Sequence, residues 1–227
     1  MKNIEKAIAL LREGKPILIY DSDSREEETD IVYAAQMVTK ESVLRMRKDG
    51  GGLICVTMPY DVAQSLGLRF LHDILMDGLQ GYEKIEANDI PYGERSAFSV
   101  PINHRRTRTG ITDRDRALTI REFARIVSLA IHKPEEAREE FGKNFRSPGH
   151  VATLIAAKNL LEERRGHTEL STAMMFLADL IPSAAIVEML GDDGYALYKN
   201  EAKNYAERND LIFLEGEEVR EFWLRRR

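Results

Sequence analysis

Residues 16–38 read PILIYDSDSREEETDIVYAAQMV, two apolar runs joined by an acidic one. The first run, residues 16–21, has the length and composition of a buried strand, and residues 31–38 resume the apolar character. The intervening residues 21–30 carry six acidic side chains and no apolar one. Ligand sites in α/β proteins tend to follow a buried strand, so this segment is the first candidate for a functional loop.

Helical and strand-like patterns alternate on both sides of this segment. Apolar residues at helical spacing precede it, from Ile4 to Leu11, and Gly14 ends that helix. Thr119 and Glu122 form a capping box that predicts a helix start. Further predicted strands are residues 53–58, 96–104, 145–157, 184–190 and 211–214, and further predicted helices are residues 39–47, 59–66, 200–209, 217–227 and one that ends near 180. This alternation predicts a mixed α/β (α+β) fold in one domain.

Composition excludes several classes of protein. The 227 residues include 33 Lys and Arg against 38 Asp and Glu, a formal charge of −5, and 43% of them are hydrophobic. The apolar fraction excludes a disordered chain, no uncharged apolar run reaches the roughly 18 residues of a membrane span, and a single cysteine excludes an internal disulfide. The acidic balance argues against nucleic acid as a general partner. The first fifteen residues lack the features of a secretory signal, so we expect a cytoplasmic protein.

The commonest catalytic motifs do not occur in the chain. It contains no Walker loop, no GxGxxG after a strand, no HExxH and no GxSxG. The usual nucleotide-binding, zinc-protease and serine-hydrolase interpretations are therefore excluded.

The acidic segment 21–30 suggests a cation site. Carboxylates packed this closely repel one another unless a cation offsets their charge, and oxygen ligands suit a hard ion such as magnesium or manganese. A solvated surface loop is the alternative, and it is the favoured interpretation of this run taken alone. Arg25 in the middle of the run adds weight to a site, because it could hold an anion beside a metal.

Residues 164–169, RRGHTE, form the second candidate, at a predicted helix N-terminus. Free backbone N–H groups and the helix dipole favour a phosphate there, and Gly166 lets the backbone approach it closely. Arg164 could add a bidentate contact, while His167 could ligate a metal or carry a proton. A basic turn with a capping threonine explains the same residues equally well.

Four weaker candidates remain. His150 follows the stiff turn of residues 147–149, although a single histidine is more often structural. Glu188 lies in an apolar run, where a carboxylate needs a function or an arginine partner. The polar loop 109–116 could hold an anion or be solvated, and Cys55 in a buried run reads as a small apolar residue.

Taken together and in this order, the motifs resemble the 3,4-dihydroxy-2-butanone 4-phosphate synthases of riboflavin biosynthesis. The resemblance covers nearly the whole chain and includes the spacings of 14 residues from His150 to Arg164 and of 21 residues from His167 to Glu188. Residues 77–95 look like the extra segment of the archaeal branch, so we expect an archaeal-type monofunctional form.

The resemblance implies a single domain, residues 1–227, in which a mixed twisted sheet is flanked by helices in three layers. It implies that Glu26 and His167 ligate magnesium or manganese, with two ions per site. The substrate-binding residues that it implies are Arg25, Glu26, Asp30, Thr112, Arg164, Arg165, Gly166, His167, Thr168 and Glu188. The catalytic residues that it implies are His150 and Glu188, with Glu28, Asp21 and Cys55 as further candidates. Glu27 departs from the family pattern, which often has Gly or Asn there, and we expect it to face solvent.

The resemblance also implies the reaction and the assembly. Family members are lyases that convert ribulose 5-phosphate into 3,4-dihydroxy-2-butanone 4-phosphate and release formate, and they form homodimers with sites near the interface. A metal on the substrate's oxygens would stabilise the enediolate formed when a base removes a proton next to the ketone. Two other interpretations stay open: another metal-dependent sugar-phosphate isomerase or aldolase, and a non-catalytic phosphate-binding module.

Overall fold

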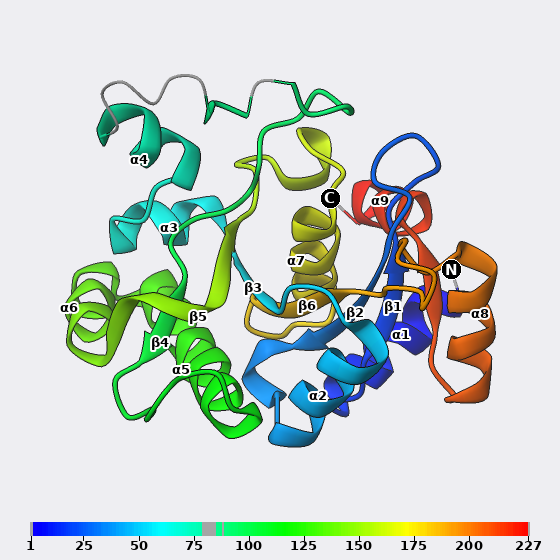
Figure 1. Ribbon diagram of the computed structural model, residues 1–227, viewed down its shortest axis with the longest axis horizontal. Helices are drawn as coiled ribbons and strands as arrows, with labels where there is room; N and C mark the ends of the chain where they lie inside the picture. Colours follow the sequence, from blue (N-terminus) through cyan, green and yellow to red (C-terminus); the bar gives the residue numbers. More distant parts are fainter. Residues whose placement is uncertain (1, 79–84, 88, 227) are drawn as a thin grey trace.

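A single seven-stranded sheet organises the chain in the computed structural model, which describes residues 2–78, 85–87 and 89–226 (Figure 1). The strand order is β4-β5-β3-β6-β2-β1-β7. The strands are β1 Ile17–Tyr20, β2 Thr29–Ala34, β3 Cys55–Met58, β4 Ile102–His104, β5 Phe145–Ile155, β6 Ala184–Glu188 and β7 Phe213–Glu215. The pairs β1·β7 and β3·β5 are parallel and the other four pairs are antiparallel, so the predicted mixed sheet is confirmed.

Helices cover both faces of the sheet and complete three layers. They are α1 Lys2–Arg12, α2 Lys40–Arg45, α3 Tyr60–Leu66, α4 Leu71–Gly78, α5 Asp113–His132, α6 Pro134–Asn144, α7 His167–Leu177, α8 Lys199–Arg208 and α9 Gly216–Arg225. One apolar cluster joins the sheet to α2, α3, α5, α6 and α8, and the other joins it to α1, α7 and α9. None of the helices in the described ranges is long and apolar enough to cross a bilayer.

The central strands are apolar on both faces, which is why their sequences read as continuous apolar runs. In β2, Ile31 and Tyr33 face one cluster while Val32 and Ala34 face the other. Successive side chains therefore alternate between the two faces, but the sequence shows no alternation of apolar and polar residues, since both faces of the sheet are buried.

The start of α5 was predicted wrongly. The helix begins at Asp113, six residues before the expected Thr119, and its N-cap is Thr112, whose Oγ1 accepts the Asp115 N–H at 3.2 Å. Thr119 instead accepts the His104 backbone N–H inside the core. The first turn of α5 is polar because it faces outward, so apolar periodicity begins only at Ala117, after the helix has started.

Other boundaries agree more closely with the sequence. Thr39 caps α2 as expected, and Gly67 ends α3 in the left-handed conformation. The charged stretch 132–143, for which the sequence predicted no element, mostly belongs to α6. The expected insertion at 77–95 lies partly outside the described residues, and its described end, residues 89–95, forms no regular helix or strand.

Candidate active site

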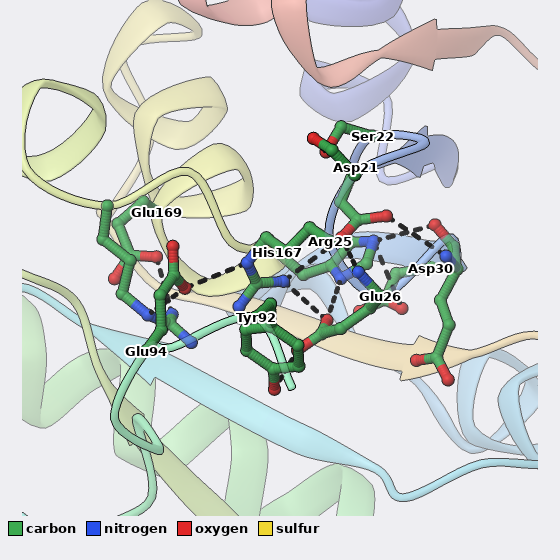
Figure 2. A network of polar contacts seen from close by, with 12 residues as sticks. Asp21, Ser22, Arg25, Glu26, Asp30, Tyr92, Glu94, His167 and Glu169 are labelled. Atoms are coloured by element: carbon green, nitrogen blue, oxygen red, sulfur yellow. Dashed lines mark hydrogen bonds and ion pairs between the residues drawn. The ribbon is translucent and has the colours of Figure 1, made fainter. Parts of the chain in front are cut away.

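Residues 21–28 of the acidic segment form the loop between β1 and β2, and Asp21 holds the shape of this loop (Figure 2). The Asp21 side chain is buried and accepts the backbone N–H groups of Glu26, at 2.9 Å, and Glu28, at 3.1 Å. Asp21 also lies 3.2 Å from Nη1 of Arg25. These bonds fold the loop back on itself, so this carboxylate organises the loop that the sequence singled out.

Glu27 occupies a left-handed backbone position in this loop, with φ of 59°. Its side chain is exposed, which confirms that it faces solvent. A left-handed conformation costs a residue with a Cβ about 1–2 kcal/mol, whereas glycine and asparagine tolerate it. The backbone therefore explains why Gly or Asn suits this position.

Replacing Glu27 by asparagine is expected to raise the free energy of unfolding by about 1 kcal/mol, because asparagine relieves the backbone cost. Urea denaturation measures the change. Glu27→Gln is the matched control, since it removes the charge and keeps the unfavourable backbone. Equal stability of the two variants would show that the conformation carries no cost.

His167 brings the second motif to the acidic loop. It is the first residue of α7 and is buried; Nδ1 lies 3.2 Å from Oε2 of Glu26, and Nε2 lies 3.2 Å from the carbonyl oxygen of Glu28. Nε2 also lies 3.7 Å from Oδ1 of Asp30. Glu26 and His167, the predicted metal ligands, are thus adjacent although 141 residues separate them in sequence.

This group fits a divalent cation. One ligand atom each from Asp21, Glu26 and His167 lies within 4.8 Å of the others. Oδ1 of Asp30 is buried and has no hydrogen-bond partner in the described part of the chain. Carboxylate oxygens and an imidazole nitrogen suit magnesium or manganese, and a buried carboxylate oxygen without a partner is costly unless something positive meets it.

The neighbouring carboxylates favour a proton on His167, which supplies a positive charge to the site. Burial opposes a charge on His167, but Asp30, Glu26 and Asp21 outweigh that effect and raise its pKa to about 10. Burial raises the pKa of Asp30 to about 8. Burial also opposes a charge on Glu26, yet its contacts with His167 and Arg25 lower its pKa to about 2. The carboxylates around His167 therefore favour a positive charge among them.

Two guanidinium groups lie beside the acidic group. Arg25 Nη1 is 2.7 Å from Glu26, and Arg164 Nη1 is 2.8 Å from Glu169, a fully buried carboxylate. Gly166 is the N-cap of α7, and a Cβ on it would lie 2.7 Å from a nitrogen of each arginine. The absence of a side chain at Gly166 thus leaves room for both guanidinium groups at the helix start, whereas the sequence had predicted room for a phosphate there.

Tyr92 and Glu94, which the sequence did not identify, close this side of the site (Figure 2). The Tyr92 hydroxyl donates to Oε1 of Glu26 at 2.8 Å, and its ring lies 4.7 Å from the Arg25 guanidinium. The Glu94 carboxylate bridges Nε of Arg25, at 2.9 Å, and Nε of Arg164, at 3.1 Å. The sequence around these residues has weak periodicity, so it does not predict which way their side chains point or what they contact.

A cavity of about 290 Å³ opens between these groups and the sheet. Its lining residues are Arg25, Glu26, Asp30, Cys55, Ile90, Tyr92, Ser96, Ala97, Phe98, Leu154, Arg164, His167, Thr168, Ile186 and Glu188. Most of the predicted site residues therefore meet at one cavity. Glu28 is half-buried beside it, and burial raises its pKa, whereas Arg165 is exposed and does not line the cavity.

Glu188 enters the cavity from the end of β6. Its Oε2 accepts the Leu53 backbone N–H at 2.7 Å. The neighbouring residue must be a glycine, because a Cβ at position 52 would lie 2.2 Å from that oxygen. Among the described residues no arginine pairs with Glu188, so the ion-pair alternative is wrong. Nearby, burial and the charges of Glu188 and Asp30 raise the pKa of the Cys55 thiol, which favours its interpretation as a small apolar residue.

Two further predicted site residues, His150 and Thr112, do not line the cavity. The side chain of Asn103 links His150 to the loop that precedes Thr112: Nδ2 lies 3.0 Å from Nδ1 of His150 and 3.4 Å from the carbonyl oxygen of Thr109. The structure thus divides the predicted site residues into a main group at the cavity and a second group around Asn103.

Comparisons with known proteins point to one family. The family model of 3,4-dihydroxy-2-butanone 4-phosphate synthase matches residues 5–222. The synthase of Archaeoglobus fulgidus is 45% identical over 97% of this chain and 94% of that protein, and that of Methanosarcina acetivorans is 44% identical over 98% and 92%. A solved structure of such a synthase in complex with two magnesium ions matches with a TM-score of 0.74 at 27% identity, over 94% of this chain and 93% of that one. That of Candida albicans matches with a TM-score of 0.73 at 27% identity, over 96% of both chains.

Proposed function

Since this chain belongs to the 3,4-dihydroxy-2-butanone 4-phosphate synthase family, we propose that it converts D-ribulose 5-phosphate into L-3,4-dihydroxy-2-butanone 4-phosphate and formate at the cavity between the acidic loop and α7. The reaction belongs to riboflavin biosynthesis. One observation carries the assignment of the site: Glu26 and His167 of the candidate cation site, two guanidiniums near a helix N-terminus and the carboxylate of Glu188 line a single cavity. A phosphate-binding module alone would gain nothing from so many carboxylates.

Glu26 and His167, with Asp21 beside them, would hold magnesium, or manganese as an alternative hard cation. We propose two ions per site, supported by the relative that was solved with two magnesium ions and by Oδ1 of Asp30, which has no hydrogen-bond partner among the described residues. When bound, the metal would stabilise negative charge on the substrate's carbonyl and hydroxyl oxygens.

Arg25, Arg164 and the start of α7 would bind the substrate's phosphate. The N–H groups of the first turn, from His167 and Thr168 onward, have no partners within their own helix and favour an anion. Glu169 holds Arg164 in place through a 2.8 Å ion pair. Anchoring the phosphate fixes the substrate's carbon chain relative to the acid and base groups.

Glu188 is suited to accept a proton from a substrate carbon. The Leu53 N–H fixes Oε2 and so orients the carboxylate in the cavity. Asp30, whose pKa burial raises to about 8, and the half-buried Glu28 provide carboxyl groups of different acidity nearby. Carboxyl groups in unlike surroundings can divide proton removal and proton donation between them.

We also propose a homodimer with its sites near the interface. Apolar side chains are exposed beside both groups of site residues. One is Leu53, whose backbone N–H bonds to Glu188, and the other is Ile111, next to Thr112. Half of the surface of each is exposed. A second copy would cover such residues. Sedimentation analysis tests this: the native chain should be a dimer, and Leu53→Asp with Ile111→Asp should yield monomers.

Replacing Glu94 by glutamine is expected to lower the KM for ribulose 5-phosphate several-fold. The Glu94 carboxylate occupies the guanidinium groups that we assign to the phosphate, and a neutral amide competes less well for them. Steady-state kinetics over a range of substrate concentrations measures the effect. Glu163→Gln is the control, because Glu163 is an exposed carboxylate next to Arg164 in the chain. A raised KM would show that Glu94 helps to hold the arginines for substrate.

Carbon-13 NMR tests the function itself. Purified protein with magnesium should release labelled formate from ribulose 5-phosphate labelled at its fourth carbon, and a chelator should stop the release. A labelled sugar isomer or cleavage fragment without formate would indicate the isomerase or aldolase alternative. Unchanged substrate with folded, metal-loaded protein would indicate a non-catalytic binder.

A further inference from the structure

Four residues leave the pairing between β4 and β5. Ile102 pairs with Val151, but the next residue, Asn103, pairs with Arg146. Residues 147–150, SPGH, are therefore an excursion of β5 opposite a single step of β4. Irregularities of this kind redirect side chains next to functional sites.

The excursion is fixed against the backbone of β4. The Ser147 hydroxyl donates to the carbonyl oxygen of Pro101 at 2.7 Å. A Cβ on Gly149 would lie 1.9 Å from the carbonyl carbon of Ile102, so only glycine permits this approach. His150 is consequently presented from a rigid turn, although its own side chain is exposed.

The side-chain amide of Asn103 has one possible orientation. The backbone N–H of His150 can only donate, so the Asn103 atom 2.9 Å from it must be the oxygen, Oδ1. Nδ2 then faces Nδ1 of the His150 ring at 3.0 Å. Because an amide nitrogen can only donate, Nδ1 must accept, and the proton of the neutral ring lies on Nε2.

The surroundings of Asn103 keep this amide in place. Its side chain is buried, and Nδ2 also points to the carbonyl oxygen of Thr109 at 3.4 Å. Gly110 packs directly on the amide: a Cβ there would lie 2.1 Å from Nδ2. A glycine at position 110 thus has a structural reason, since it allows the polar loop 109–116 to close over Asn103.

We infer that Asn103 is a positioning residue that holds His150 as the Nε2–H tautomer, so that the neutral ring presents a hydrogen-bond donor to a substrate oxygen. This rests on the proposed function in one respect, the participation of His150 in the reaction. In that form Nε2 cannot remove a proton from carbon; it stabilises negative charge on oxygen instead, as neutral imidazoles do in other enzymes. Proton removal from carbon then falls to a carboxylate.

Asn103→Asp separates this role from folding. The carboxylate has the same shape and still accepts the His150 backbone N–H, but it cannot donate to Nδ1. The ring proton is therefore expected to move to Nδ1. Asn103→Ala removes both contacts. Asn144→Ala is the matched control, because within the described ranges the Asn144 side-chain amide bonds to Glu140 alone.

Long-range ¹H–¹⁵N NMR of protein with labelled histidine reads the tautomer without substrate or metal, at the alkaline end of a pH titration, with His150→Gln assigning the signal. We expect Nε2–H in the native chain and in Asn144→Ala, and Nδ1–H in Asn103→Asp. A native ring protonated on Nδ1, or an unchanged tautomer in Asn103→Asp, would overturn the inference.

Kinetics provide the second readout. Asn103→Asp is expected to lower kcat for formate release about 100-fold, the effect of losing one oriented donor, with KM changed less than about threefold. A kcat within twofold of the native value despite a moved proton would overturn the positioning role. If the native protein releases no formate, the proposed function fails, whereas the NMR result still decides the tautomer.

Discussion

Glu26→Ala and His167→Ala are each expected to lower formate release at least about 1,000-fold, or about 4 kcal/mol of transition-state stabilisation. Glu26 and His167 lie 3.2 Å apart and belong to the group of atoms that fits a divalent cation. Each variant lacks one of the ligand atoms that would hold the ion. Glu26→Ala also removes the acceptor of the Tyr92 hydroxyl and a partner of Arg25.

Two measurements check this result. Calorimetric titration with magnesium should show loss or strong weakening of binding in both variants, and the NMR assay should show loss of formate. Glu27→Ala is the matched control, because it removes a neighbouring carboxylate that faces solvent. Normal turnover in either Glu26→Ala or His167→Ala would refute the metal assignment.

Glu188→Gln should preserve substrate binding and lower kcat by about 10²- to 10⁴-fold, the usual contribution of a positioned acid–base group. Glutamine has the same shape, and its amide oxygen can still accept the Leu53 N–H. What it loses is the ability to take a proton from carbon. The change should therefore appear in kcat rather than in the affinity for substrate.

Calorimetric titration with ribulose 5-phosphate, completed before measurable turnover, gives the affinity of the variant for substrate. Single-turnover kinetics gives the rate of the chemical step. Glu201→Gln, an exposed change on α8, controls for loss of a surface charge. If Glu188→Gln turns over at the native rate, Glu188 takes no part in the chemistry and Asp30 or Glu28 becomes the leading candidate for the base.

The sequence predicted those parts of the fold that depend on buried apolar runs. The strands around residues 16–38 follow directly from their composition, whereas the start of α5 does not, because its polar first turn hides the helix. The contact between Glu26 and His167 was anticipated only through a resemblance to a family, since no local pattern links residues so far apart. Tyr92 and Glu94 could not be found because contacts made by an irregular segment depend on tertiary packing.

Individual roles were harder to predict than membership of the site. Asp21 was a catalytic candidate, yet its carboxylate bonds to the backbone of its own loop. His150 was identified by its motif, but the residue that orients it, Asn103, lies in a different strand and carries no signature of its own. Neighbours across a sheet become visible only once the register is known.

The burial of α7 has a consequence for how the site responds to heat and to mutation. Ten of its eleven residues are buried, including His167 at its first position, so this half of the cation site moves only when the core moves. The loop between β1 and β2 supplies the other half, and its backbone is held by the Asp21 side chain. Amide hydrogen exchange should therefore be slow in α7 from Leu170 onward, where the helix bonds begin, with or without magnesium. The Glu26 and Glu28 amides should exchange faster and become protected when the ion binds. Random mutagenesis should likewise find the loop tolerant at exposed positions and α7 intolerant at nearly every one.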